Sequence, residues 1–186
     1  MNCEVMNGLL CCYFAKQKFI IHEQKKIYST HDEYDCHRRN ADSFVSATSE
    51  GSTPLDIKLV KDFVIAGHKD LPVVKEMLRE HPNLIYCRYD FNNGDFEEAI
   101  EGAGHMGNKE IANYLIIQGA RVNLFVLTML GQTNLVKPVL EAYPELVFAK
   151  GPHGFTLLHH AKVGEATELH DFLLEKGLKE THVKIR

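Results

Sequence analysis

The sequence predicts an all-α solenoid of about four stacked helix pairs. Apolar residues repeat at helical spacing in short stretches, and a glycine follows most of these stretches. The turn glycines also recur: Gly131 and Gly164 are a full repeat period of roughly 33 residues apart, and the interval from Gly107 to Gly131 is shorter. Short helix pairs bury their apolar faces only when further pairs stack against them, so the pattern indicates a repeat architecture.

The clearest unit is Gly102–Asn123. Asn108 is a good N-cap, because its side-chain oxygen can accept a hydrogen bond from a free amide of the first helical turn. Ile111 and Leu115 then lie on one apolar stripe. Gly119 is expected to end the helix in the left-handed conformation that glycine adopts without strain.

The first helix pair is expected to begin at Thr53, which can cap a helix, with Pro54 at the first helical position. The second helix of this pair is predicted to start at Pro72 and to end at His81-Pro82, because a proline disfavours helix in the residue before it.

The next unit begins with the longest connection between helix pairs, Leu84–Gly94. Its Asn-Gly turn signal predicts a projecting hairpin or finger. A short helix over Asp95–His105 is expected to follow.

The third and fourth pairs follow the same pattern. A helix is expected over Leu124–Leu130 with almost no finger before it, and the helix after that is expected to be shortened or kinked at Pro138 and to end at Tyr143-Pro144. The last helix is expected to stop at Gly177.

Two stretches resemble the ankyrin-repeat family. Ala103–Gly107 and Gly119–Asn123 match its small-residue pair, glycine turn and Gly-Ala-x-Val-Asn ending, and Gly154–Ala161 is similar to its Gly-x-Thr-Pro-Leu-His-x-Ala signature, with leucine in place of proline. Met129–Lys137 together with Gly151–Ala161 also resembles a group of small bacterial ankyrin-repeat proteins.

The resemblance implies an ankyrin-repeat solenoid over residues 53–178, a third repeat that is abbreviated, and a polar tail over residues 179–186. Residues 1–52 are expected to be a poorly ordered extension or a weak cap on the first repeat. The resemblance also implies that His159 forms hydrogen bonds with Thr156 and with the neighbouring loop backbone. The residues expected to have structural roles are Thr156, His159, Gly107, Gly119, Gly131 and Gly164.

Composition limits the classes of function. The formal net charge of −4 and the pI of about 6.2 give no electrostatic footprint for nucleic acid. No apolar run reaches the roughly 18–20 residues that a membrane span needs. The five cysteines lack a disulfide-framework spacing and the start of the chain lacks a basic signal region, so a cytoplasmic location is expected.

No pattern for a catalytic, cofactor-binding or metal site stands out. The sequence has no phosphate loop, HExxH motif or nucleophile elbow. Histidines and carboxylates at 159–171 (His159, His160, Glu165, His170 and Asp171) are the basis of an alternative, a metal-dependent enzyme. The N-terminal set of Cys3, Cys11, Cys12, His22, His31, Cys36 and His37 lacks the paired spacing of a zinc site. The expectation is a protein that is not an enzyme and needs no cofactor.

The predicted function is protein binding through finger loops and the concave helix face. Tyrosine and arginine dominate many interface hot spots, and the candidate contact residues are Tyr86, Arg88, Tyr89, Phe91, His153 and Phe155. Packing of the same rings on the neighbouring repeat remains an alternative. The partner is expected to be another protein, and the chain a monomer or a weak self-associating solenoid. Self-association would use Leu59, Val60 and Phe63 if the N-terminal segment leaves them exposed.

Overall fold

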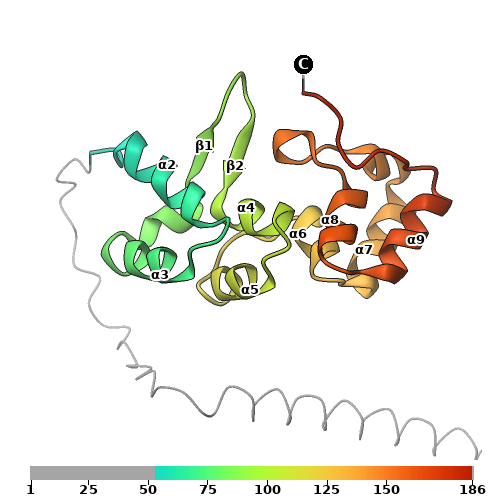
Figure 1. Ribbon diagram of the computed structural model, residues 1–186, viewed down its shortest axis with the longest axis horizontal. Coiled ribbons are helices and arrows are strands. Elements are labelled where there is room, and N and C mark those ends of the chain that lie inside the picture. Colours follow the sequence, from blue (N-terminus) through green and yellow to red (C-terminus); the bar gives the residue numbers. More distant parts are fainter. Residues whose placement is uncertain (1–52, 186) are drawn as a thin grey trace, which may run out of the picture. The chain divides into compact units, whose positions relative to one another are not determined.

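The computed structural model describes residues 53–185 (Figure 1). The predictions for residues 1–52, including those for the cysteines and histidines in that segment, lie outside the described residues. Within the described part, the α-helices are α2 (Ile57–Ala66), α3 (Leu71–Glu80), α4 (Ala99–His105), α5 (Lys109–Ile117), α6 (Leu124–Met129), α7 (Thr133–Ala142), α8 (Leu157–Val163) and α9 (Thr167–Glu175). The remaining elements are η1 (Pro82–Tyr86), β1 (Arg88–Asp90), β2 (Phe96–Glu98), η2 (Pro144–Phe148) and η3 (Pro152–Gly154).

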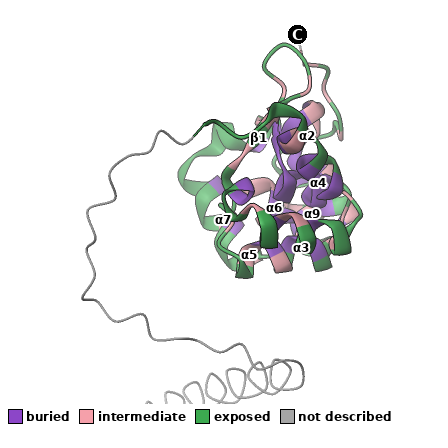
Figure 2. Cartoon of the chain, turned by 90° about the vertical axis from the view of Figure 1, so that its left-hand side faces the viewer, coloured by how far each residue is buried: buried purple, intermediate pink, exposed green. Residues whose placement is uncertain are grey.

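The predicted mostly helical architecture is confirmed, and its helices pack in pairs. Helices adjacent in sequence contact each other in the pairs α2–α3, α4–α5, α6–α7 and α8–α9. The first helix of each pair packs against the first helix of the next, so α2, α4, α6 and α8 form one row. Figure 2 shows buried residues concentrated in this row, with α3 and α5 exposed on their outer sides. The row therefore supplies about half of the apolar core, and the second helices and the connecting segments supply the rest.

The first helix starts later than predicted. It begins at Ile57, and its N-cap is Asp56, whose side chain accepts a hydrogen bond from the backbone amide of Lys58. Thr53 and Pro54 precede the helix and are exposed. An aspartate is as good a cap as a threonine, and the apolar stripe begins only after it. Asn108 caps α5 as predicted, through a 3.1 Å bond from the Ile111 amide.

The connection after the first pair is a β-hairpin. Strands β1 and β2 pair antiparallel with Tyr89 opposite Glu97, and Asn93 and Gly94 take positive φ values of 51° and 86° at the tip. The hairpin projects from the helical stack (Figure 1). The predicted helix over Asp95–His105 is therefore wrong at its start: its first residues belong to the second strand, and helix begins only at Ala99.

The turn glycines divide into two kinds. Gly107, Gly119 and Gly131 take positive φ, as expected of glycines that end helices. Gly164 has an ordinary helical φ of −84°. A Cβ there would collide with the carbonyl oxygen of Met129, so this glycine is required by the close approach of two repeats rather than by its φ.

Two further expectations change. Helix α7 continues through Pro138 without being shortened there, and it ends at Ala142, directly before Tyr143-Pro144 as predicted. The Pro138 ring lies on an exposed face, where water can solvate the carbonyl that loses its partner. The segment after α9 is tied to the fold, because the backbone amide of Val183 donates to Gly154 and that of Thr156 donates to Thr181.

Of the three apolar residues that a bare first repeat was expected to expose, Val60 and Phe63 are covered and Leu59 is half-buried against the core. Val60 is 6% exposed and Phe63 is fully buried within the core shared by α2, α3 and α4. These residues therefore offer no free surface for self-association. None of the helices in residues 53–185 has the length and apolar character needed to cross a membrane.

Candidate functional site

The candidate contact residues in and just before the hairpin have different environments. Tyr86 and Arg88 are exposed, whereas Tyr89 and Phe91 are half-buried against the core. Phe91 makes edge-on ring contacts with Tyr89 at 5.0 Å and with His153 at 5.1 Å between centroids. Tyr89 and Phe91 therefore pack against the core, which is the alternative that the sequence left open, and they do not form an exposed contact surface.

Of the candidates in the later loop, His153 contacts Phe91, and the Phe155 ring lies next to His153, with 6.4 Å between those two ring centroids. Phe155 contacts His105 edge-on at 5.1 Å and stacks on His159 at 4.2 Å. The aromatic residues of the hairpin and of the later loop thus surround one interior position at the end of α4.

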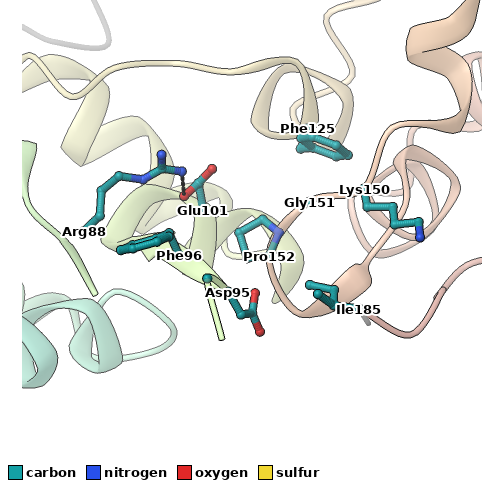
Figure 3. A pocket seen from close by; sticks show the side chains of 10 residues that line it. Arg88, Asp95, Phe96, Glu101, Phe125, Lys150, Gly151, Pro152 and Ile185 are labelled. Carbon is teal, nitrogen blue, oxygen red and sulfur yellow. Dashed lines mark hydrogen bonds and ion pairs between the residues drawn. The ribbon is translucent and has the colours of Figure 1, made fainter. Parts of the chain in front are cut away.

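A groove lies next to this aromatic group (Figure 3). It has a volume of about 500 Å³ and lies between the hairpin and the loop at residues 150–152. Arg88 and Phe96 lie on one side, Lys150 and Ile185 on the other. Its full lining is Arg88, Gly94, Asp95, Phe96, Glu101, Phe125, Lys150, Gly151, Pro152 and Ile185.

Ion pairs hold the hairpin side of this groove. The Arg88 guanidinium lies 3.5 Å from Glu98 Oε1 and 3.4 Å from Glu101 Oε2. Glu101 also accepts hydrogen bonds from the Glu98 amide and from the Asn123 side chain. Phe96 is not held in this way, and 48% of its surface is exposed. Its ring therefore offers apolar surface at the edge of the groove.

The interior position beneath the aromatic residues holds a buried carboxylate. Glu97 is fully buried, and neither of its carboxylate oxygens has a hydrogen-bond partner. Three histidines surround it: Nε2 of His153, His68 and His105 lie 3.4, 3.5 and 3.6 Å from its oxygens. These distances exceed those of good hydrogen bonds. One potential ligand atom from each of these four residues lies within 4.8 Å of the others.

Small residues make room for this cluster. His68 follows Gly67 at the end of α2, and a Cβ at Gly67 would overlap the backbone of Ala99. A Cβ at Gly102 would lie 2.8 Å from ring atoms of His68. The two glycines therefore allow the end of α2 to lie directly against α4 and place the His68 ring next to His105.

Burial favours the neutral form of two of the three imidazoles, those of His68 and His105. Burial is the main cause that lowers the pKa of His105 to about 3, and the neighbouring histidines lower it further. Burial also lowers the pKa of His68. Burial raises the pKa of Glu97 to about 7, against the opposing effect of His153. At neutral pH, His68 and His105 therefore keep unprotonated nitrogen lone pairs.

The role expected of His159 is only partly correct. Its Nε2–H donates to the backbone carbonyl of His105 at 2.8 Å, which is a contact with a neighbouring repeat. The bond to Thr156 is made instead by His160, whose Nδ1–H donates to the Thr156 carbonyl at 2.8 Å. The Thr156 hydroxyl donates to the backbone carbonyl of Glu180. The Thr156 hydroxyl is therefore hydrogen-bonded to the C-terminal segment, a contact that the sequence did not predict.

The histidines and carboxylates at 159–171 do not assemble into a site. His170 lies beside Asp171 at the surface, and His159 and His160 are used in the backbone contacts just described. Within residues 53–185, the group at Glu97 is the one place where three or more potential metal ligands converge.

Sequence reasoning missed this group because its members are far apart along the chain. No local spacing connects residues 68, 97, 105 and 153, and the strand that carries Glu97 was predicted as helix. No signal in the sequence marks Glu97, because its position on the buried side of a short strand is seen only in the structure.

Comparison with known proteins adds no assignment. The chain matches no protein-family model. No curated protein matches it.

Proposed function

We propose that the chain is an ankyrin-type interaction module that binds an extended segment of another protein in the groove between hairpin and later loop. The observation that carries this proposal is the groove itself, which combines an exposed phenylalanine with an exposed lysine on opposite sides.

Support for the ankyrin type comes from the arrangement of the repeats. The first helices form a continuous row, the second helices flank it, and a hairpin projects from the connection between the first two pairs. The ankyrin signature at Gly154–Ala161 spans the turn into α8. A rigid stack of this kind loses little entropy when it binds.

The groove chemistry suggests the kind of segment. Phe96, Phe125 and Ile185 offer apolar surface to one bulky side chain, and Lys150 offers a cation to a carboxylate. Arg88 is paired with Glu98 and Glu101, so its main role is to form one side of the groove and not to bind an acidic residue of the ligand. The proposed ligand is an extended segment with a bulky apolar residue near an acidic one.

Selection from a random peptide library displayed on phage, followed by affinity measurements on the selected peptides, tests the proposal. Phe96→Ala and Lys150→Glu should each weaken binding about tenfold or more, as loss of an interface anchor does. Ile117→Ala and Lys109→Glu are matched controls on α5, which lies on the opposite side of the stack from the hairpin (Figure 1). Selected peptides that bind the groove variants and the wild type equally well would refute the groove as the binding surface.

A further inference from the structure

We propose that His68, Glu97, His105 and His153 bind one divalent metal ion of the zinc type. This site is inferred independently of the protein-binding role, since none of the four side chains lines the groove.

The unpartnered Glu97 carboxylate is the first reason. A buried polar group without a hydrogen bond is costly, and a buried carboxylate more so. Both oxygens of Glu97 lack partners in a fully buried position. A cation between this carboxylate and the three rings would offset that cost, because it gives both carboxylate oxygens a partner of opposite charge.

The distances fit a four-coordinate ion. Metal–ligand bonds of about 2.0–2.1 Å in a tetrahedron place neighbouring ligand atoms roughly 3.3–3.4 Å apart. Nε2 of His153 and Nε2 of His68 lie 3.4 and 3.5 Å from Oε2 of Glu97, and Nε2 of His105 lies 3.6 Å from Oε1. These three distances are close to the tetrahedral spacing and long for direct hydrogen bonds, and the four ligand atoms together lie within 4.8 Å of one another.

Hydrogen bonds from the Nδ1 atoms of two of the histidines orient their rings with Nε2 towards Glu97. His68 donates from Nδ1 to the carbonyl of Val64 at 3.0 Å, and His153 donates from Nδ1 to Asp95 Oδ2 at 2.7 Å. Each bond places the proton on Nδ1 and leaves the Nε2 lone pair facing Glu97. A backbone carbonyl or a carboxylate behind a ligating histidine is the usual outer shell of a metal site.

The donor set selects the class of metal. Three imidazoles and one carboxylate suit zinc and related first-row ions, whereas calcium and magnesium prefer oxygen ligands. Four protein ligands complete a tetrahedral shell, which is the arrangement of structural zinc sites. The His68 and His153 side chains are 21% and 27% exposed, so an ion can reach the site from their side.

A bound ion would join segments from distant parts of the chain. The ligands belong to the end of α2, to β2, to the end of α4 and to the turn η3. Asp95 and Pro152, which neighbour two of the ligands, also line the groove. The ion would therefore fix the hairpin to the later loop.

Titration of the full-length chain, stripped of metal with a chelator, tests the site. We expect one Zn²⁺ per chain by calorimetry, a higher melting temperature with the ion, and visible absorption of four-coordinate Co²⁺ without the charge-transfer bands that thiolate ligands produce. The absence of thiolate bands distinguishes this site from binding by cysteines elsewhere in the chain.

Variants locate the ion. Glu97→Gln should abolish tight binding, and His153→Gln should weaken it at least tenfold. His153 is only partly buried, so its variant is expected to fold, which circular dichroism checks. His170→Gln is the matched control, because His170 also lies next to a carboxylate but at the surface. Wild-type protein that binds neither ion, thiolate bands in the Co²⁺ spectrum, or binding unchanged in folded His153→Gln protein would each overturn the proposal.

Discussion

Asp95 holds His153 at two points, although 58 positions separate them in the sequence. Its Oδ1 accepts the backbone amide of His153 and its Oδ2 accepts the ring Nδ1–H, both at 2.7 Å. One carboxylate therefore fixes the position, orientation and tautomer of the imidazole. The hairpin and the later loop meet through this pair.

Asp95→Asn should weaken metal binding without removing a ligand. Asparagine keeps one oxygen but loses the charge that stabilises the Nδ1–H form of His153, so the zinc dissociation constant is expected to rise about 10–100-fold. Calorimetric titration of the metal-free variant measures this change.

Asp171→Asn is the matched control for that experiment. Asp171 also faces a histidine ring, with His170 Nδ1 at 3.4 Å from Oδ1, but this pair is at the surface. Equal effects of the two substitutions would show that the pairing of Asp95 with His153 has no special role in binding the ion.

Gly164→Ala should destabilise the stack. The backbone of Gly164 has an ordinary helical φ, so the cost comes from contact of the new methyl group with the Met129 carbonyl. Overpacking of this kind costs about 1–3 kcal/mol. Urea denaturation at fixed metal content measures the change in the free energy of unfolding.

Gly94→Ala separates crowding from backbone strain. Gly94 has a positive φ of 86°, and a Cβ there would meet nothing within 4 Å. Its alanine variant is expected to lose about 1 kcal/mol through strain alone. If the alanine at position 164 costs no more than the one at position 94, the close approach of the two repeats is not the reason for the glycine.

His160 should make the fold sensitive to acid. Burial lowers its pKa to about 4, despite the hydrogen bond to Thr156 that favours the charged form. The unfolded chain has an ordinary histidine pKa near 6.5 and therefore binds a proton first as the pH falls. Stability from the neutral ring is complete above about pH 6.5 and decreases towards pH 4, by up to roughly 3 kcal/mol.

His160→Asn tests this effect, since its amide can replace the Nδ1–H donor but does not titrate. His159, with its ring 5.6 Å from that of His160, is present in both proteins. Urea denaturation between pH 7 and pH 4 should show a steeper loss of stability for the wild type. An equal loss of stability with falling pH in the two proteins would contradict the assignment of the acid sensitivity to His160.

Pro138→Ala should stabilise α7. The proline lies inside a ten-residue helix on an exposed face, where it removes one backbone hydrogen bond. Alanine restores the donor and has a higher helix propensity, so the free energy of unfolding is expected to rise by about 1–3 kcal/mol. Glu141→Ala in the same helix is the control, and a loss of stability in the proline variant would indicate that its ring is needed for packing.

Local signals in the sequence were sufficient for most of the helical fold. The Asn108 cap, the turn glycines at 107, 119 and 131, and the stop before Tyr143-Pro144 act over a few residues, and the structure has each of them. Predictions failed where a local preference met a tertiary contact. The residues before Ala99 formed a strand because β1 pairs with them, and the hydroxyl of Thr156 donates to a segment 24 residues away.

The sequence alone determined the helix pairs, their turns and the hairpin, because capping, periodicity and turn chemistry depend on neighbours along the chain. Tertiary structure decided which hairpin side chains are exposed and which are packed. It also brought His68, Glu97, His105 and His153 together from α2, β2, α4 and η3. The physical reason is that a ligand cluster depends on the positions of side chains in three dimensions, and stacking of repeats sets those positions without leaving a spacing in the sequence.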